Sequence, residues 1–139
     1  MKLPRLLAIL LSVFAASTLA GEKTSGNFTI HYNALTAAAL PATAAARYGI
    51  SRDAQQGLLV IAVSDRDGRN VAATVTGKAT SLLGHAVPLA FRNLDENGEH
   101  SSLGRFTVNE SGSLRFQLEV SPQGGAPIRL DFVQDFVLD

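Results

Sequence analysis

Apolar and polar side chains alternate without a break along Leu114-Arg115-Phe116-Gln117-Leu118-Glu119-Val120. Successive residues of a β-strand point to opposite faces, so the four apolar side chains of this stretch share one face. Such a pattern is typical of an antiparallel sheet that has one face against the core and the other in water. This stretch therefore predicts an antiparallel β protein.

The same alternation recurs elsewhere in the chain. It covers residues 28–33, 71–76 and 128–132, and in residues 85–93 the side chains of Val87, Leu89 and Phe91 share one face. Residues 58–63 are instead continuously apolar, which is typical of a central strand with little exposure.

Two residues predict irregularities in these strands. Pro88 indicates an edge position for residues 85–93, because proline cannot donate a ladder hydrogen bond. The apolar parity switches between Leu103 and Phe106, and Gly104 lies at the switch, so we expect a β-bulge there.

Turn signals separate the strand-like segments, at residues 65–68, 95–98, 109–112 and 121–125. Their Asp, Asn and Gly residues supply the positive backbone angles that tight hairpins need. About seven short strands at this spacing predict an antiparallel β-sandwich of immunoglobulin-like architecture, with a small barrel as the alternative. The paired cysteines and core tryptophan of antibody domains are absent from the sequence, so only the architecture is predicted.

Residues 40–50 predict one short helix, between the first two of these strands. Pro41 suits the first helical position, since its missing N–H would be unbonded there. Arg47 favours the C-terminal end of the helix dipole, and Gly49 suits a left-handed cap. We expect this helix to cross over one end of the sandwich.

The N-terminus has the features of an export signal. Lys2 and Arg5 precede an apolar stretch, and the small residues Thr18 and Ala20 fit a cleavage site after Ala20. The apolar stretch, residues 6–16, is about half of the roughly 20 residues that a membrane-spanning helix needs. We therefore predict a cleaved signal peptide over residues 1–20, one domain over residues 21–139 and a periplasmic location.

Composition excludes several classes of function. The 139 residues include 12 Lys and Arg against 12 Asp and Glu, and no Cys. Without a thiol the chain can form no disulfide or zinc–thiolate site and can perform no thiol catalysis. The even charge balance and the dispersed basic residues also argue against nucleic-acid binding.

No pattern in the sequence predicts a catalytic, cofactor or metal site. His31, His85 and His100 are too far apart for a short metal-ligand spacing, and no Gly-x-Ser-x-Gly, Ser-x-x-Lys or Gly-x-Gly-x-x-Gly motif is present. Residues 65–76 lack the glycine and glutamate register of an EF-hand loop. We expect a metal-free, cofactor-free protein that is not an enzyme.

Five stretches occur in a characteristic order along the chain: His31-Tyr32-Asn33-Ala34, Leu40-Pro41, Tyr48-Gly49-Ile50-Ser51-Arg52, Gly57-Leu58-Leu59-Val60-Ile61-Ala62-Val63 and Val75-Thr76-Gly77-Lys78-Ala79-Thr80-Ser81-Leu82-Leu83-Gly84. Together they resemble an exported family of Gram-negative bacteria, catalogued as domain-of-unknown-function family 4426. The resemblance extends over residues 26–138. It implies a periplasmic β-sandwich and supplies no catalytic or binding residues.

We therefore expect a non-enzymatic binding or accessory module for another envelope protein. The alternatives are a small-ligand or metal-carrying periplasmic module and an enzyme. The long connection over residues 35–56 suggests where a partner would bind, because long loops are often functional. Leu40, Tyr48 and Ile50 form the candidate interaction surface, since tyrosine is favoured at interfaces. The other interpretation is that they plug the open end of the sandwich.

Overall fold

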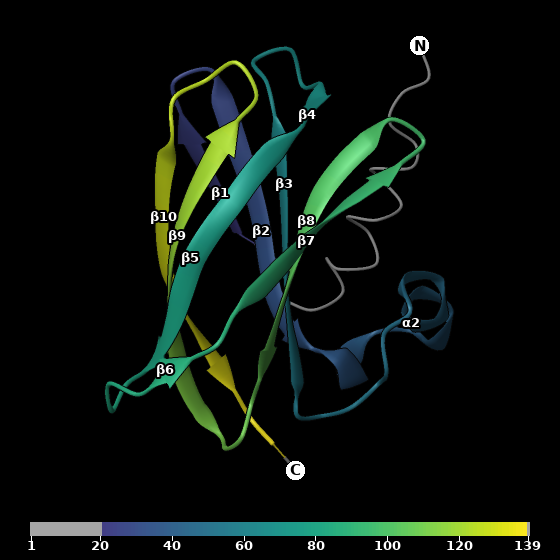
Figure 1. Ribbon diagram of the computed structural model, residues 1–139, viewed down its shortest axis with the longest axis vertical. Coiled ribbons are helices and arrows are strands. Elements are labelled where there is room, and N and C mark those ends of the chain that lie inside the picture. Colours follow the sequence, from purple (N-terminus) through teal and green to yellow (C-terminus); the bar gives the residue numbers. More distant parts are fainter. Residues whose placement is uncertain (1–20, 139) are drawn as a thin grey trace.

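The computed structural model describes residues 21–138, which form two antiparallel sheets that face each other (Figure 1). Sheet A has the order β1-β2-β3-β8-β7 with β4 also paired to β3, and sheet B has the order β10-β9-β5-β6. The antiparallel β-sandwich predicted from the sequence is confirmed. The predicted signal peptide, residues 1–20, lies outside the described residues.

Ten strands make up the two sheets, three more than the strand-like segments of the sequence. Sheet A contains β1 (Gly21–Ser25), β2 (Phe28–Thr36), β3 (Gln56–Ser64), β4 (Asn70–Val71), β7 (Ala90–Glu96) and β8 (Glu99–Thr107). Sheet B contains β5 (Ala73–Ser81), β6 (Ala86–Val87), β9 (Gly112–Pro122) and β10 (Ile128–Phe136). The additional strands are β1, which is polar, and β4 and β6, which are only two residues long.

Apolar side chains of the two sheets meet in the main core, and a row of aromatic rings runs through it. Tyr32 lies 4.5 Å from Phe132, which lies 5.0 Å from Phe116, between ring centroids. Phe106 continues the row, 5.2 Å from Phe116 and 5.5 Å from Phe136. Tyr32 and Phe106 come from sheet A and the other three from sheet B, so the rings join the sheets across the core. The inward faces predicted for residues 28–33, 114–120 and 128–132 are thereby confirmed.

Strand β3 is the central strand of sheet A, as its apolar run predicts, and it is buried on both faces. Leu59, Ile61 and Val63 belong to the main core. Leu58 and Val60 belong to a second cluster on the outer face of sheet A, the outer cluster. The residues that cover them come from the connection between β2 and β3, which contributes Ala37, Leu40, Ala45 and Ile50.

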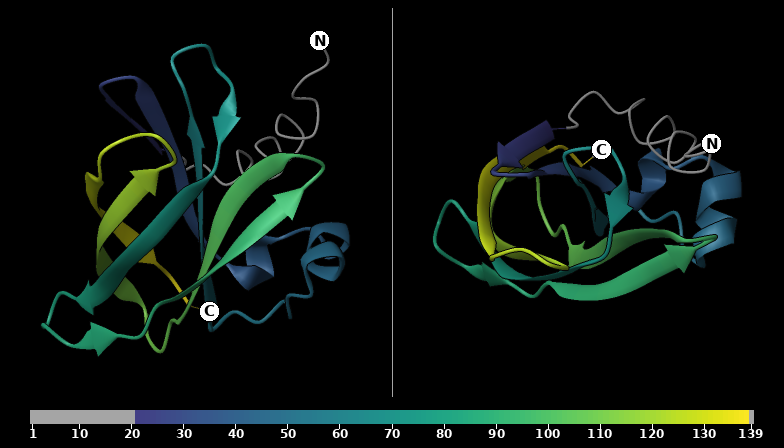
Figure 2. Two further views of the ribbon diagram at one scale, coloured as in Figure 1. Left: turned by 45° about the horizontal axis from the view of Figure 1, so that its top comes forward. Right: turned by 90° about the horizontal axis from the view of Figure 1, so that it is seen from above.

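That connection contains a 3₁₀ turn, η1 (Ala37–Ala39), and one helix, α2 (Ala42–Tyr48). Gly49 ends α2 with a φ of 66°, and the N–H of Ile50 donates to the carbonyl of Ala45 at 2.8 Å. This is the glycine cap expected at that position. Figure 2 shows α2 outside the two sheets, beside β7 and β8. The helix therefore covers the outer face of sheet A and does not cross the end of the sandwich. No helix within residues 21–138 is long and apolar enough to span a membrane.

The β-bulge predicted at Gly104 is wrong. β8 pairs with β3 and with β7 in continuous register, and Gly104 lies opposite Leu59 and Phe91. The apparent switch of parity arises because β8 is buried on both faces. Leu103 packs into the outer cluster, and Phe106 packs into the main core.

Two stretches that the sequence predicts as single strands each divide between the two sheets. Residues 71–76 break at Ala72, where the chain passes from β4 in sheet A to β5 in sheet B. Residues 85–93 break at Pro88, where the chain returns from β6 in sheet B to β7 in sheet A. Both β6 and β7 are edge strands, which agrees with the position expected from Pro88. The alternation persists through both breaks because the apolar side chains before and after each break point into the core that the two sheets share.

The turn signals mark the boundaries of strands, but one of them is not a hairpin. Residues 65–68 connect β3 to β4, and Asn97 and Gly98 have φ values of 53° and 82° in the hairpin of β7 and β8. Gly124, with a φ of 83°, lies in the hairpin of β9 and β10. Residues 109–112 instead carry the chain from β8 in sheet A to β9 in sheet B.

Candidate functional site

An open apolar groove of about 330 Å³ lies at one end of the sandwich, between the β5–β6 hairpin and the β8–β9 connection. Its lining includes four apolar side chains that we call the floor, Val87, Val108, Leu114 and Phe136. Val108, Leu114 and Phe136 are buried members of the main core, and Val87 packs against it. The groove therefore lies directly over the hydrophobic core. A volume of this size is within the range of small-molecule and side-chain pockets.

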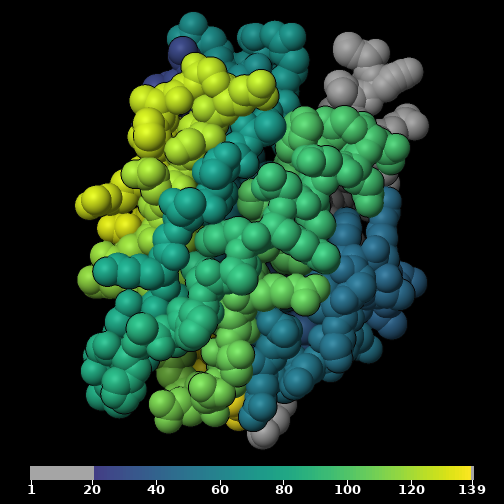
Figure 3. Space-filling view, viewed as in Figure 1, coloured from purple at the N-terminus to yellow at the C-terminus, as the bar shows by residue number. Residues whose placement is uncertain are grey.

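Two leucines that line this groove are exposed to solvent. Leu82 is 69% exposed and Leu83 is 78% exposed, and both lie in the turn between β5 and β6. The hairpin that carries them projects from the body of the molecule at the lower left of Figure 3. Single exposed leucines are common on protein surfaces and need no explanation. Exposed leucines that are continuous with an apolar groove form a larger apolar patch, which is a typical sign of a binding surface.

The turn that presents the leucines is held by its own hydrogen bonds. The N–H groups of Ser81 and Gly84 donate to the carbonyls of His85 and Ser81, both at 2.9 Å. The N–H of His85 also donates to Ser81 Oγ at 3.0 Å. Gly84 has a φ of 88°, which only glycine adopts without strain. The turn is thus fixed in a shape that holds Leu82 and Leu83 away from the core.

The opposite wall of the groove is also anchored. Ser111 Oγ accepts a hydrogen bond of 2.8 Å from the N–H of Leu138, and Ser113 Oγ donates to the Asp135 carboxylate. The N–H of Val108 donates to the carbonyl of Gln55 at 2.7 Å. These contacts tie the β8–β9 connection to β10, to the C-terminal segment and to the start of β3. The groove is therefore formed in the free chain.

Charge around the groove is sparse and acidic. Glu110 and His85 are the titratable residues that line it, and both are exposed. Neither Lys nor Arg is among the lining residues. The Asp135 carboxylate lies next to the wall, where it accepts from Ser113.

His31 lies on the outer face of sheet A in a line of three polar residues. Its Nδ1 is 3.3 Å from the Glu22 carboxylate, and its Nε2 is 3.2 Å from Ser64 Oγ. The order carboxylate, imidazole, hydroxyl is that of a hydrolase triad. However, the three residues come from adjacent strands of an exposed sheet face, and the Glu22 side chain is 64% exposed. Cross-strand polar neighbours of this kind are an ordinary feature of a solvated sheet.

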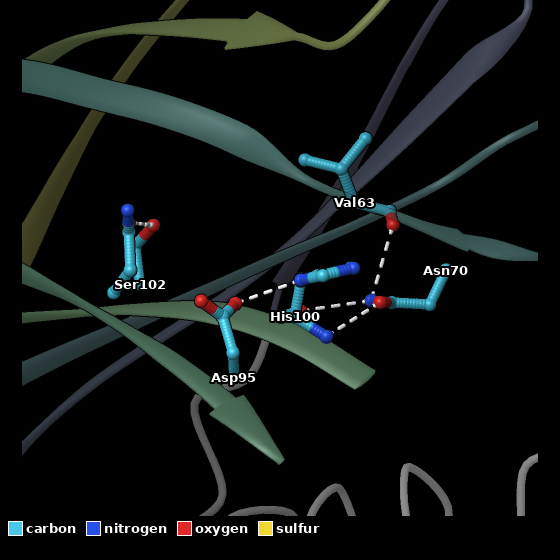
Figure 4. A network of polar contacts seen from close by, with 6 residues as sticks. Val63, Asn70, Asp95, His100 and Ser102 are labelled. Carbon is cyan, nitrogen blue, oxygen red and sulfur yellow. Dashed lines mark hydrogen bonds and ion pairs between the residues drawn. The ribbon is translucent and has the colours of Figure 1, made fainter. Parts of the chain in front are cut away.

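His100 has a structural role in β8, on the other side of β3 and β4 from His31 (Figure 4). Its Nδ1 lies 2.7 Å from Asp95 Oδ1, and its backbone N–H and carbonyl both bond to the Asn70 side chain, at 2.6 and 2.8 Å. This network joins β4 and β7 to β8. His85 lies in the β5–β6 turn, so the three histidines are in separate places. Within residues 21–138 no group of three His, Asp or Glu side chains could hold a metal ion.

The predicted interaction surface is placed mostly inside the molecule. Leu40 is 1% exposed and Ile50 is 8% exposed, and both pack into the outer cluster of sheet A. Tyr48 is half-buried at the edge of this cluster. The structure therefore gives Leu40 and Ile50 a packing role, over a sheet face rather than at the end of the sandwich. Whether Tyr48 contacts a partner stays a prediction.

Polar contacts with β7 hold the end of α2 in place. Arg47 forms an ion pair of 2.9 Å with Glu96, and Arg92 donates to the carbonyl of Tyr48 at 2.7 Å. Burial raises the pKa of the Tyr48 hydroxyl, and the nearby Glu96 carboxylate raises it further, while Arg47 acts in the opposite direction. The arrangement is that of a docked structural element.

Sequence reasoning did not identify Leu82 and Leu83 as a candidate site. The signal was present, because two leucines directly before a turn glycine are unusual where a turn is normally polar. What the sequence could not show is the apolar groove beside them. One wall of that groove is the β8–β9 connection, which lies about 25 residues further along the chain. Only the tertiary fold brings this connection next to the β5–β6 turn.

Comparison with known proteins identifies the family. A crystal structure of a DUF4426 family protein from Pseudomonas aeruginosa PAO1 is similar with a TM-score of 0.75 and 28% identity, over 86% of this chain and 96% of that chain. FetP from uropathogenic Escherichia coli strain F11, recombinantly expressed in the periplasm of E. coli, is similar with a TM-score of 0.62 and 10% identity, over 86% and 95%.

At 10% identity the likeness to FetP concerns the fold alone. None of the curated proteins is similar enough in sequence to match the chain. The family model for the domain of unknown function DUF4426 matches residues 22–139. The resemblance noted in the sequence is thereby confirmed, and the chain belongs to the DUF4426 family.

Proposed function

We propose that this protein is an exported, non-enzymatic binding module that holds another envelope protein at the groove between Leu82, Leu83 and the β8–β9 connection. The observation that carries this proposal is the exposure of the two leucines beside an open apolar groove. Water contact with these side chains is unfavourable, at about 25 cal/mol for each Å² of apolar surface. A partner that covers them would recover this free energy on binding.

The periplasmic location is part of the proposal. The N-terminal sequence has the charge and apolar pattern of an export signal. The fold is also shared with FetP, which was expressed in the periplasm of E. coli.

A small-ligand module is the second candidate, because the groove volume of about 330 Å³ would hold a small apolar molecule. Small-molecule pockets bury most of the ligand surface, however. Here two leucines at the rim remain exposed, and a partner with a larger surface is needed to cover them. The geometry therefore favours a macromolecule.

Photo-crosslinking from single positions in living cells would test this function. A benzophenone side chain in place of Leu83 should give one discrete crosslinked product. The matched control is the same side chain in place of Thr76, which is exposed on the outer face of β5 and far from the groove. No product from position 83, or the same product from both positions, would contradict the proposal.

A further inference from the structure

We infer that the occupant of this groove is an extended peptide segment in which apolar residues are next to Lys or Arg. The inference rests on the proposed function, since it concerns the same groove. Three features carry it: an apolar floor, a free strand edge beside the floor, and a rim that contains the Glu110 carboxylate and neither Lys nor Arg.

The apolar floor defines the side chains that would enter the groove. Val87, Leu114 and Phe136 belong to the core or pack against it, and they offer no hydrogen-bonding group. A polar side chain placed over these three residues would lose its hydration there without compensation, which is costly. The polar residues of the lining, Ser81, Thr107, Asn109 and Ser111 among them, could bond to polar groups of the occupant elsewhere in the groove. Aliphatic or aromatic side chains suit this floor, and Leu82 and Leu83 would cover their exposed sides.

The free strand edge explains why the occupant is a peptide. β6 is the last strand of sheet B, and it pairs with β5 alone through Ala79–Val87 and Thr80–Ala86. Within the described residues, the other edge of β6 has no strand partner. Ala86 and Val87 also line the groove. An extended peptide can bond to such an edge through its main chain while alternate side chains enter a pocket, as in β-augmentation.

The sequence of β6 limits how far such pairing can extend. Pro88 directly follows the strand and has no N–H to donate. Short edge strands that end in proline are a common protection against unspecific pairing. The main chain of the occupant would therefore bond over only one or two residues, so the affinity would depend on the side chains in the groove.

The charges at the rim define the polar part of the occupant. Glu110 and His85 line the groove, Asp135 lies next to its wall, and Lys and Arg are absent from the lining. A basic residue beside the apolar ones would be attracted to these carboxylates, whereas an acidic one would be repelled. Rim charges of this kind act on specificity and on the rate of association more than on affinity.

Selection from a library of random peptides displayed on phage would test the inference. The purified full chain is the target, and peptides that also bind the Leu82→Ser/Leu83→Ser variant are removed. Both leucines are exposed, so this variant should melt like the wild type, and melting curves check that it is folded. The expected result is enrichment of peptides that combine aliphatic or aromatic residues with Lys or Arg.

A matched pair of charge variants separates the role of the rim from a general effect of charge. Glu110→Gln should weaken the selected peptides about two- to fivefold at low ionic strength, as expected for one exposed charge pair, and this difference should shrink in salt. Glu119→Gln, on the outer face of β9, should change nothing.

Two results would overturn the inference. Selected peptides that depend on the leucines but lack basic residues, with equal affinity for Glu110→Gln, would refute the chemistry assigned to the occupant while leaving the proposed function intact. A selection with no leucine-dependent peptide would refute a peptide occupant. The crosslink from position 83 then decides separately whether the proposed function fails as well.

Discussion

Leu58 and Leu59 are consecutive residues of β3, and both are completely buried, but they pack into different hydrophobic clusters. Leu59 faces sheet B in the main core, and Leu58 faces outward, where η1 and α2 cover it. Sheet A therefore has two buried faces along β3, which accounts for the continuous apolar run of this strand. It also means that the long β2–β3 connection is part of the hydrophobic structure.

This second cluster predicts that a substitution in the connection will be as costly as one in the core. Leu40 is 1% exposed, so Leu40→Ala should lower the free energy of unfolding by about 2–5 kcal/mol, the usual range for a buried leucine. Chemical denaturation measures this change. Leu83→Ala is the control, because Leu83 is 78% exposed and should change stability by less than about 0.5 kcal/mol. Equal stabilities of the two variants would contradict the packing of the outer cluster.

The cap of α2 gives a prediction about backbone conformation. Gly49 has a φ of 66°, and a Cβ at this position would meet no atom within 4 Å. Gly49→Ala should therefore lose stability only through backbone strain, by about 1–2 kcal/mol. Gly49→Asn should lose less, since asparagine adopts this conformation more readily. An alanine variant as stable as the wild type would show that the helix does not end in this way.

Two glycines beside phenylalanine rings should differ in their tolerance of a methyl group. A Cβ on Gly57 would lie 2.1 Å from Phe106, and a Cβ on Gly104 would lie 2.8 Å from Phe91. Phe106 is fixed by ring contacts with Phe116 and Phe136, whereas Phe91 is partly exposed on an edge strand.

Gly57→Ala should therefore be the more destabilising substitution, and the cost of overpacking is typically about 1–3 kcal/mol. Thermal unfolding of the two variants measures the difference. A lower melting temperature for Gly104→Ala than for Gly57→Ala would mean that the core around Phe106 is looser than described.

The environment of Tyr48 predicts how it titrates. In a Tyr32→Phe variant, Tyr48 is the one remaining tyrosine, so the ultraviolet absorbance of tyrosinate reports on it alone. Burial and then Glu96 raise its pKa, so the midpoint should lie above the ordinary value of 10.0. Glu96→Gln should lower the midpoint, and Arg47→Gln should raise it. A midpoint unaffected by Glu96→Gln would refute the contact between α2 and β7.

The same shift has a consequence for stability. Because the folded state favours neutral Tyr48, this contribution is fully present below pH 10 and is lost as the pH rises through the raised pKa. A Tyr48→Phe variant should lack this part of the alkaline loss of stability. Denaturation experiments over this pH range would show the difference, and parallel curves for the two proteins would contradict it.

The sequence predicted what depends on local periodicity. The faces of β2, β9 and β10 follow from alternation alone. The helix cap at Gly49 follows from the residue type, because glycine adopts the left-handed conformation of a helix C-cap most readily. The sequence did not reveal where the chain changes sheets, since at Ala72 and at Pro88 the alternation continues into a strand of the other sheet. A period of two shows which side chains share a face and does not show which sheet they belong to.

The wrong bulge in β8 and the unexpected place of Leu40 and Ile50, over a sheet face, share one physical cause. A bulge at Gly104, and either an interface or a plug at the end of the sandwich for Leu40 and Ile50, are expected when each sheet has one buried face. The outer cluster buries the second face of sheet A, so Leu103 points outward and is still enclosed, by residues about 60 positions earlier in the chain. Contacts over such distances depend on the tertiary fold and not on local propensity.

The central claim is that the binding surface lies at the Leu82–Leu83 end, whereas residues 37–50 serve as structural cover. An amide spectrum of the isotopically labelled chain, titrated with the peptide Lys-Val-Leu-Val-Lys, tests it most directly. We predict chemical-shift changes confined to residues 81–87 and 107–114, which line the groove, with residues 37–50 unchanged. Changes that centre on residues 37–50, with none around Leu82 and Leu83, would contradict the account.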